Sequence, residues 1–189
     1  MQFAKDSFFL ALQQRLASVN PGRTVTVNGV TVPAVLVVEN LPPSSGEPWP
    51  NAFYIEWGEA DVVGGHAGNG AMISLDVVIS YYSLGSVQSM VDRGRLLAQL
   101  DDELLAICQP PNTDKRDYTQ APSADLGTNV FWTQPSFTEG KGSGMYWGRT
   151  SFPERMKSGV TESAESHQDA RVERKARLTL YFFSEVTLS

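Results

Sequence analysis

The sequence predicts an α+β fold, in which a mostly antiparallel β-sheet with a long hairpin is flanked by two main helices. Three patterns lead to this prediction: helical spacing of apolar residues at 6–19, strand-like segments between 23 and 83, and a second helical stripe at 86–107 followed by a final strand. Because helices and strands are segregated along the chain, we expect one sheet of about four to six strands. The 189 residues suit a single domain, 1–189, with a loop-rich insertion at about 112–168.

The first helix is predicted from four apolar residues that share one helical face: Phe8, Leu12, Leu16 and Val19. The Asn-Pro-Gly sequence at 20–22 ends it, because proline disfavours helical geometry in the residue before it. Thr and Val then alternate on both sides of Asn28 and Gly29, the pair that a type I′ hairpin turn favours. The expected strands are 23–27 and a second one that starts at Val30 and continues through the apolar run "PAVLVVE".

A proline-rich loop at 40–51 leads to a long antiparallel hairpin. Its strands are the segments 52–63 and 71–83, joined by a glycine-rich tip. The second helix, with Ser86 as its N-cap, carries an apolar stripe: Val87, Met90, Leu97, Leu100, Leu104 and Ile107. Short strands are expected in "NVFWTQPSF" and "GMYWGRTSF". In the final strand, alternation places Leu178, Leu180 and Phe182 on one face and Arg177, Thr179 and Tyr181 on the other.

The hairpin tip has a composition that also occurs in phosphate-binding loops: Gly64, Gly65, His66, Gly68, Asn69 and Gly70. A Walker A loop requires Lys and then Ser or Thr after its last glycine, where this chain has Ala71 and Met72. The glycine spacing is the reverse of a Rossmann fingerprint, and the strand that follows offers no helix N-terminus to hold an anion. We therefore interpret the tip as a finger that projects from the sheet and becomes ordered against a neighbouring subunit.

The most prominent charged cluster is the run of three acids Asp101, Asp102 and Glu103 in the second helix. Carboxylates can act as acid and base or bind magnesium, but consecutive helical residues point about 100° apart and cannot converge on one ion unaided. We expect all three on the exposed polar face of the helix. There they are candidates for lining a channel, or for pairing with Arg93 or Arg95 of a neighbouring subunit.

Composition argues against several classes of function. A net charge of −6 disfavours a protein that grips nucleic acid through clustered Lys and Arg. His66 and His167 have no Cys or carboxylate at metal-ligand spacing, and no Gly-x-Ser-x-Gly elbow is present. Cys108 is the only cysteine and is expected to be a buried thiol. We predict no cofactor, no metal and no membrane span, since no apolar stretch approaches the roughly 20 residues that cross a bilayer.

Four segments carry a resemblance to a known family. They are the N-terminal helix "FAKDSFFLALQQRLA", a β-meander with a long hairpin, the helix "SMVDRGRLLAQLDDELLAI" and the closing strand "RLTLYFF". In this order the chain resembles the tail terminator, or tail-completion (neck), proteins of tailed bacteriophages, over positions 1–110 and about 170–189. The insertion at 112–168 and the loop at 40–51 depart from the short family members, so a head-closure or other collar role also stays open.

The resemblance implies a structural virion protein without catalytic residues. Such proteins form a ring, usually of six subunits, that caps the tail tube and joins it to the head–tail connector. The implied partners are copies of the chain itself, the tail tube protein and the connector proteins. DNA passes through the ring without specific binding, and assembly takes place in the host cytoplasm.

Two other classes of function remain open from the residues alone. One is an enzyme with a carboxylate site at 101–103. The other is a small-ligand or carbohydrate-binding module that uses its tryptophans: Trp49, Trp57, Trp132 and Trp147. Few basic residues are interleaved with these tryptophans, so core or protein–protein contacts are favoured over stacking on bases.

Overall fold

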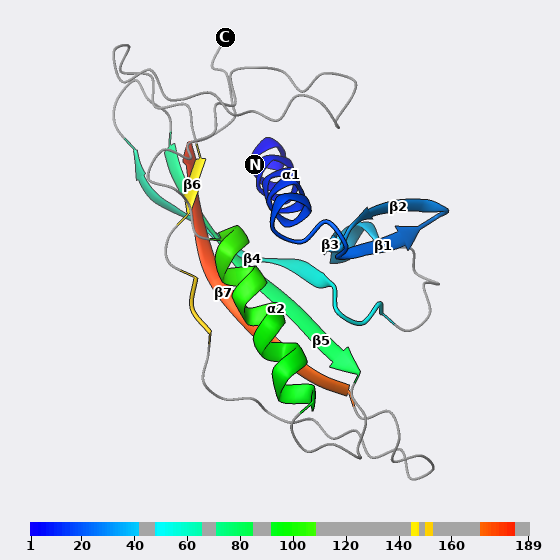
Figure 1. The fold of residues 1–189 in the computed structure, drawn as a ribbon. Helices are drawn as coiled ribbons and strands as arrows, with labels where there is room; N and C mark the ends of the chain where they lie inside the picture. Colours follow the sequence, from blue (N-terminus) through cyan, green and yellow to red (C-terminus); the bar gives the residue numbers. More distant parts are fainter. Residues whose placement is uncertain are drawn as a thin grey trace.

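The computed structural model describes residues 1–41, 48–65, 71–84, 92–108, 145–147, 150–152 and 171–183. Within these residues the fold is α+β, as the sequence predicts (Figure 1). The helices are α1 (Gln2–Val19), the 3-10 helix η1 (Val38–Asn40) and α2 (Asp92–Cys108). The strands are β1 (Thr24–Val27), β2 (Val30–Pro33), β3 (Val35–Val37), β4 (Phe53–Gly65), β5 (Ala71–Leu84), β6 (Met145–Trp147) and β7 (Arg171–Phe183). None of the described helices is long and apolar enough to cross a bilayer.

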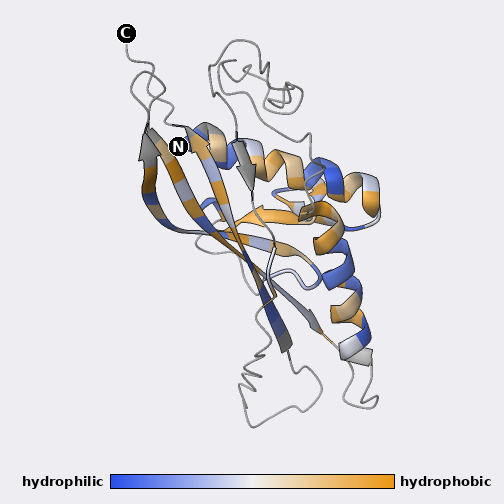
Figure 2. Cartoon of the chain, turned by 90° about the vertical axis from the view of Figure 1, so that its left-hand side faces the viewer, coloured by the Kyte–Doolittle hydropathy of each residue, from blue (hydrophilic) through white to orange (hydrophobic). Residues whose placement is uncertain are grey.

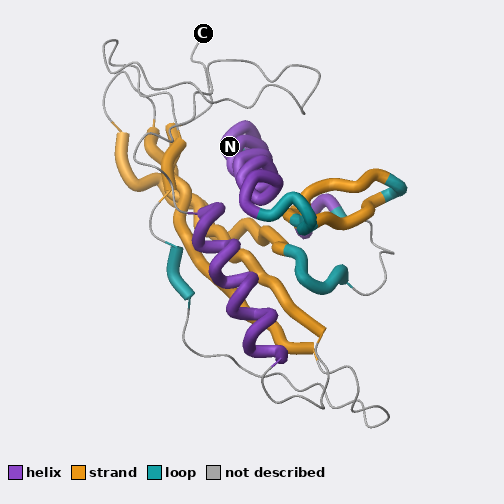
Figure 3. The backbone as a smooth tube through the Cα atoms, in the orientation of Figure 1, coloured by secondary structure: helices purple, strands orange, loops and turns teal. Residues whose placement is uncertain are grey.

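The main sheet has five strands in the order β3-β4-β5-β7-β6. β3 runs parallel to β4, whereas every other pair of neighbours is antiparallel. The predicted long hairpin is confirmed as β4 and β5, and β7 pairs with β5 from Arg171 to Phe183. Both α-helices lie on the same face of this sheet, and α1 packs against α2 (Figures 1 and 3). The sheet therefore has one helix-covered face and one outer face.

Alternation along the long strands builds the core between the sheet and the helices. In β5, the buried side chains Leu75, Val77, Ile79 and Tyr81 occupy every second position. Figure 2 shows the same alternation of hydrophobic and hydrophilic residues along the long strands. In β7, Leu178, Leu180 and Phe182 are buried while Arg177 is exposed, which confirms the face predicted for the final strand.

Each α-helix contributes one apolar face to this core. The predicted stripe of α1 is confirmed for Phe8, Leu12 and Leu16, but Val19 is 48% exposed because the helix ends there. α1 begins at Gln2 rather than at residue 6, since the buried Ala4 extends the same face by another turn. In α2, Leu97, Leu100, Leu104 and Ile107 are buried as predicted. The predicted start of this helix, with Ser86, Val87 and Met90, lies outside the described residues.

The first hairpin forms a separate two-stranded sheet of β1 and β2, which we call the arm. Its turn is the predicted one, with φ values of 51° at Asn28 and 80° at Gly29. The prediction that the second strand continues through residues 34–38 is wrong, because the chain changes sheets at Ala34. There the amide N–H of Ala34 donates to the carbonyl of Arg23 at the base of the arm, while the carbonyl of Ala34 accepts from the N–H of Phe53 in the main sheet. Pro33, which has no N–H to donate, ends the arm strand.

The segment at 112–168 is described only in part. The strand expected in "GMYWGRTSF" is present as β6, which pairs with β7 at the edge of the main sheet. Ser151 adds an isolated bridge to Arg177 of the same strand. The strand expected in "NVFWTQPSF" lies outside the described residues.

Candidate subunit interface

The glycine finger lies at the far end of the β4–β5 hairpin. Gly64 and Gly65 belong to β4 and pair with Met72 and Ala71 of β5. The described residues do not include His66, Gly68, Asn69 and Gly70. That the finger becomes ordered against a neighbouring subunit therefore stays a prediction. The structure does place a strand directly after it, as expected for a hairpin tip and in contrast to the helix that follows a phosphate-binding loop.

Within the part of the chain that the structure describes, one edge of β4, the strand that leads to the glycine finger, has no partner strand over most of its length, although η1, which continues from β3, packs against β4. β3 pairs with β4 only from Phe53 to Ile55, and among the described residues no strand pairs with that side of β4 at 56–65. Val62 and Val63, in this stretch, are 72% and 47% exposed. We call residues 56–65 of β4 the open edge. A row of unpaired backbone N–H and C=O groups beside exposed β-branched side chains is a template for pairing with another strand.

Two irregularities shape this open edge. The register between β4 and β5 shifts between Trp57 and Ala60 and again between Val62 and Gly64. At the first shift Gly58 lies so close to β5 that an added Cβ would be 3.1 Å from the Cβ of Asp76. Bulges of this kind bend an edge strand and restrict how far an added strand can follow it.

The three acids of α2 do not share one exposed face, and this prediction is wrong for two of them. Asp101 is only 22% exposed at its side chain, where it accepts a hydrogen bond from Tyr81 of β5 and pairs with Arg174 of β7. Glu103 is 8% exposed at its side chain and pairs with Arg23. Asp102, between them, is exposed as predicted.

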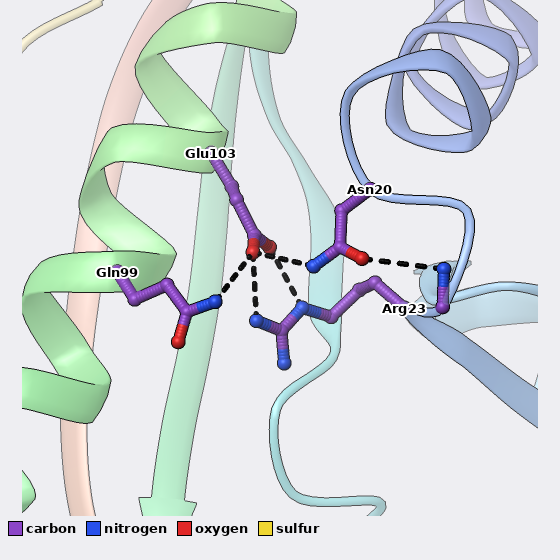
Figure 4. Close-up of polar contacts among 5 residues, drawn as sticks. Asn20, Arg23, Gln99 and Glu103 are labelled. Atoms are coloured by element: carbon purple, nitrogen blue, oxygen red, sulfur yellow. Dashed lines mark hydrogen bonds and ion pairs between the residues drawn. The ribbon is translucent and has the colours of Figure 1, made fainter.

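Glu103 joins three parts of the fold (Figure 4). Arg23, at the base of the arm, donates two hydrogen bonds to its carboxylate, of 2.7 Å from Nε and 2.8 Å from a terminal nitrogen. Asn20, which follows α1, donates a third of 2.7 Å, and Gln99, one turn earlier in α2, lies at 3.4 Å. The two-pronged guanidinium–carboxylate geometry is the strong, directional form of an ion pair.

These contacts also set the charge state of Glu103. Burial alone raises the pKa of its carboxyl group, but the hydrogen bonds from Arg23 and Asn20 and the guanidinium charge outweigh burial, so the pKa lies below its ordinary value. The group is therefore ionised and already satisfied by its own chain. Asp101 and Glu103 each form an ion pair with a different arginine, and these ion pairs argue against a carboxylate active site at residues 101–103.

Sequence reasoning missed these partners because they come from distant segments. Helical spacing did contain a signal: Asp101 follows Leu97 by four residues, and Glu103 precedes Ile107 by four, so both border the buried stripe. Nothing in the local pattern pointed to Arg23 or Arg174. The predicted pairing of the acids with Arg93 or Arg95 of a neighbouring subunit stays a prediction. Arg95 is exposed, and the side chain of Arg93 is outside the described residues.

The tryptophans whose side chains the structure describes pack against the core, and the thiol of Cys108 lies in it. The ring of Trp57 meets that of Phe8 edge to face at 6.2 Å, and the ammonium of Lys5 lies 5.2 Å from its centroid. Trp49 also packs against the core. Cys108 is buried, and burial raises the pKa of its thiol to about 12, so it stays protonated and unreactive. Trp132, His66 and His167 lie outside the described residues, as does the side chain of Trp147.

The outer face of the sheet carries a depression of about 600 Å³, between Gly58 and Glu59 of β4 and Arg177 of β7. Charges of both signs line it, and Asp76, one of the lining residues, accepts a 3.0 Å hydrogen bond from Thr179. Within the described residues, no three His, Cys, Asp or Glu side chains are grouped to hold a metal ion. The depression lacks the apolar enclosure that is typical of small-ligand sites.

The functional conclusion rests on the open edge, the arm and the buried ion pairs, because comparisons with known proteins give no match. No protein-family model matches the chain. No curated protein matches it either.

Proposed function

We propose that this chain is a structural subunit of a homo-oligomeric ring in the neck of a tailed bacteriophage, where it caps the tail tube as a tail terminator and joins it to the head–tail connector. The observation that carries the proposal is the open edge of β4, with Val62 and Val63 exposed beside the glycine finger. Subunits of a ring cover such edges by contact with their neighbours.

The order of elements supports the same proposal. The helix α1, the long β4–β5 hairpin, the helix α2 and the closing strand β7 follow one another in the order on which the resemblance to tail terminators is based. The DNA that passes through such a ring must slide without being held, and a chain with a net charge of −6 is suited to that. Of the candidate channel charges, Asp102 and Arg95 remain as exposed groups, whereas Asp101 and Glu103 hold the subunit together.

The proposal is tested first with the purified chain. Size-exclusion chromatography with light scattering should give a mass several times that of the 20.7 kDa chain, rising with concentration towards a closed ring. Negative-stain images should then show rings alone and rings at one end of tubes of the tail tube protein. A chain that stays monomeric at every concentration and leaves tail tubes uncapped is not a tail terminator.

A genetic experiment tests the role in the particle. Phage that lack the gene for this chain should accumulate filled heads and tails that are not joined, or tails of irregular length. Supplying the chain in trans should restore joined particles. Normal particles made in its absence would contradict the proposal even if the purified chain forms rings.

A further inference from the structure

We propose that the ring is built by strand addition, in which β1 of the arm of one copy pairs with the open edge of β4 in the next copy. This inference rests on the proposed ring and specifies how its subunits join. It names one occupant for the open edge, a second copy of the chain, and one segment of that copy.

An added strand is the partner that the open edge fits. Beyond Ile55, the outward N–H and C=O groups of β4 have no strand beside them among the described residues. Main-chain groups of this kind are satisfied by an extended segment that joins the sheet. The two register shifts leave a short regular stretch at residues 60–62, and β1, a strand of four residues, is long enough to cover it.

Charge argues against self-pairing of the open edge. Glu56, Glu59 and Asp61 lie along it and are exposed. If two copies joined through the same edge about a two-fold axis, these carboxylates would face one another, and like charges opposite each other destabilise a strand pair. The added strand should therefore be uncharged or basic, and the contact should be head-to-tail.

β1 meets these requirements. Its sequence Thr-Val-Thr-Val carries no charge, and its residues have high β-propensity. The polar–apolar alternation of β1 is in step with that of residues 60–62, Ala-Asp-Val, so a paired strand can place a threonine beside Asp61. The exposed hydroxyl group of Thr24 can then donate a hydrogen bond to a carboxylate of the open edge, whereas that of Thr26 already shares a 3.2 Å hydrogen bond with Thr31 of β2.

The arm also offers its edge in the right place. It is a sheet of its own, and β1 has no strand on its second side within the described residues, whereas β2 lies nearer α1 and ends in Pro33. In Figure 1 the arm extends to the right of α1, while the far end of the β4–β5 hairpin lies at the upper left. Two complementary edges at opposite ends of one chain give a heterologous contact, which closes into a ring when the rotation per subunit allows it.

Paired cysteines test this contact directly. In a Thr26→Cys, Asp61→Cys double variant, oxidation should produce a ladder of covalent oligomers on a non-reducing gel, up to the size of the ring. Thr26→Cys with Glu59→Cys covers the neighbouring register. Each single variant should stay monomeric on the gel, and a mixture of the two single variants should give dimers only. The buried Cys108 is common to all variants and should contribute nothing.

The matched control is Thr26→Cys with Asp102→Cys, which places the second thiol on an exposed position of α2. Three results would overturn the proposal: no ladder in either register, a ladder of equal strength in the control, or dimers from Asp61→Cys alone. The last would mean that the open edge pairs with itself.

A second pair of variants measures the same contact without disulfides. Val62→Lys should weaken association about tenfold or more, because an edge lysine opposes strand addition. Val19→Lys is the matched control, since Val19 is also exposed but lies at the end of α1. Both variants should keep the circular dichroism spectrum of the parent.

The outcomes separate this inference from the proposed function. Rings that form normally in Val62→Lys, without cross-links between arm and open edge, contradict strand addition and leave the ring intact as a proposal. A parent chain that forms no oligomer at all contradicts both.

Discussion

Truncation of Glu103 to alanine should destabilise the fold strongly, although this acid lies in a run that resembles solvated surface. The carboxylate accepts two hydrogen bonds from Arg23 and one from Asn20, all between 2.7 and 2.8 Å. After the substitution, the Arg23 guanidinium would remain at a site where only 15% of its side chain is exposed. The loss of stability therefore has two causes: the missing hydrogen bonds, and the unpaired, poorly solvated charge of Arg23.

The expected magnitude follows from these contacts. A hydrogen bond to a charged group contributes about 1.5–3 kcal/mol, and removing one partner of a fully buried ion pair costs about 3–5 kcal/mol. Because 8% of the Glu103 side chain and 15% of the Arg23 side chain remain exposed, water screens the pair slightly, and we expect about 3 kcal/mol. With a urea m-value of about 2 kcal/mol/M, the unfolding midpoint should fall by about 1.5 M.

Urea unfolding followed by tryptophan fluorescence, at concentrations where the chain is monomeric, measures this change. Asp102→Ala is the matched control, since its side chain is exposed, and should shift stability by less than about 0.5 kcal/mol. A double-mutant cycle with Arg23→Ala should give a coupling of about 2 kcal/mol between the two sites. If Glu103→Ala behaves like Asp102→Ala, or the cycle shows no coupling, the ion pair does not hold the arm to α2.

Three further predictions concern pH and close packing. The pKa of Glu103 is lowered from 4.5, so the stability that its carboxylate contributes is complete above pH 4.5 and is lost as the pH falls below that value. In a plot of the urea midpoint against pH, Glu103→Gln should therefore reduce the slope on the acid side. Burial raises the pKa of Tyr81 from 10.0 to about 12 and outweighs the opposing effect of the Arg174 charge. The free energy of unfolding should therefore fall between pH 10 and 12, and Tyr81→Phe should remove this dependence of the thermal midpoint on pH. Gly58→Ala should lower stability by about 1–2 kcal/mol, because the added Cβ would meet the β5 backbone at 3.2 Å. Gly94→Ala has open space around it on α2 and should raise stability by up to about 1 kcal/mol. Thermal melts that rank the two variants in the opposite order would contradict this packing.

Local sequence patterns predicted the elements whose geometry is set by near neighbours. The Asn28-Gly29 turn, the stripe of α2 from Leu97 to Ile107 and the alternation of β7 all depend on residues close in the chain, and all three are present. The division of the expected long strand at Ala34 could not be predicted in this way. It depends on Ala34 bridging Arg23 and Phe53, two residues that the sequence does not relate to each other.

The error about the acids has the same physical origin. A helical wheel assigns a residue to a polar or apolar face, but it does not show whether a cation from another segment reaches that face. Arg23 and Arg174 reach α2 from either side of the core stripe and convert Asp101 and Glu103 into internal contacts. The substitution of all three acids by lysine, which the exposed arrangement would tolerate, should therefore unfold the subunit. Only Asp102 can be changed to test a role in the channel.

The arm separates stability from association in a way that experiments can exploit. A lone two-stranded hairpin is marginal in water, so its root must hold it. The root is formed by the buried Val25, by Ala34, which links both sheets, and by the Arg23–Glu103 pair. The tip contributes little to this, since Val30 is 61% exposed. Substitutions at the root should therefore lower the free energy of unfolding, whereas substitutions along the exposed side of β1 should leave it unchanged and alter only the assembly of subunits.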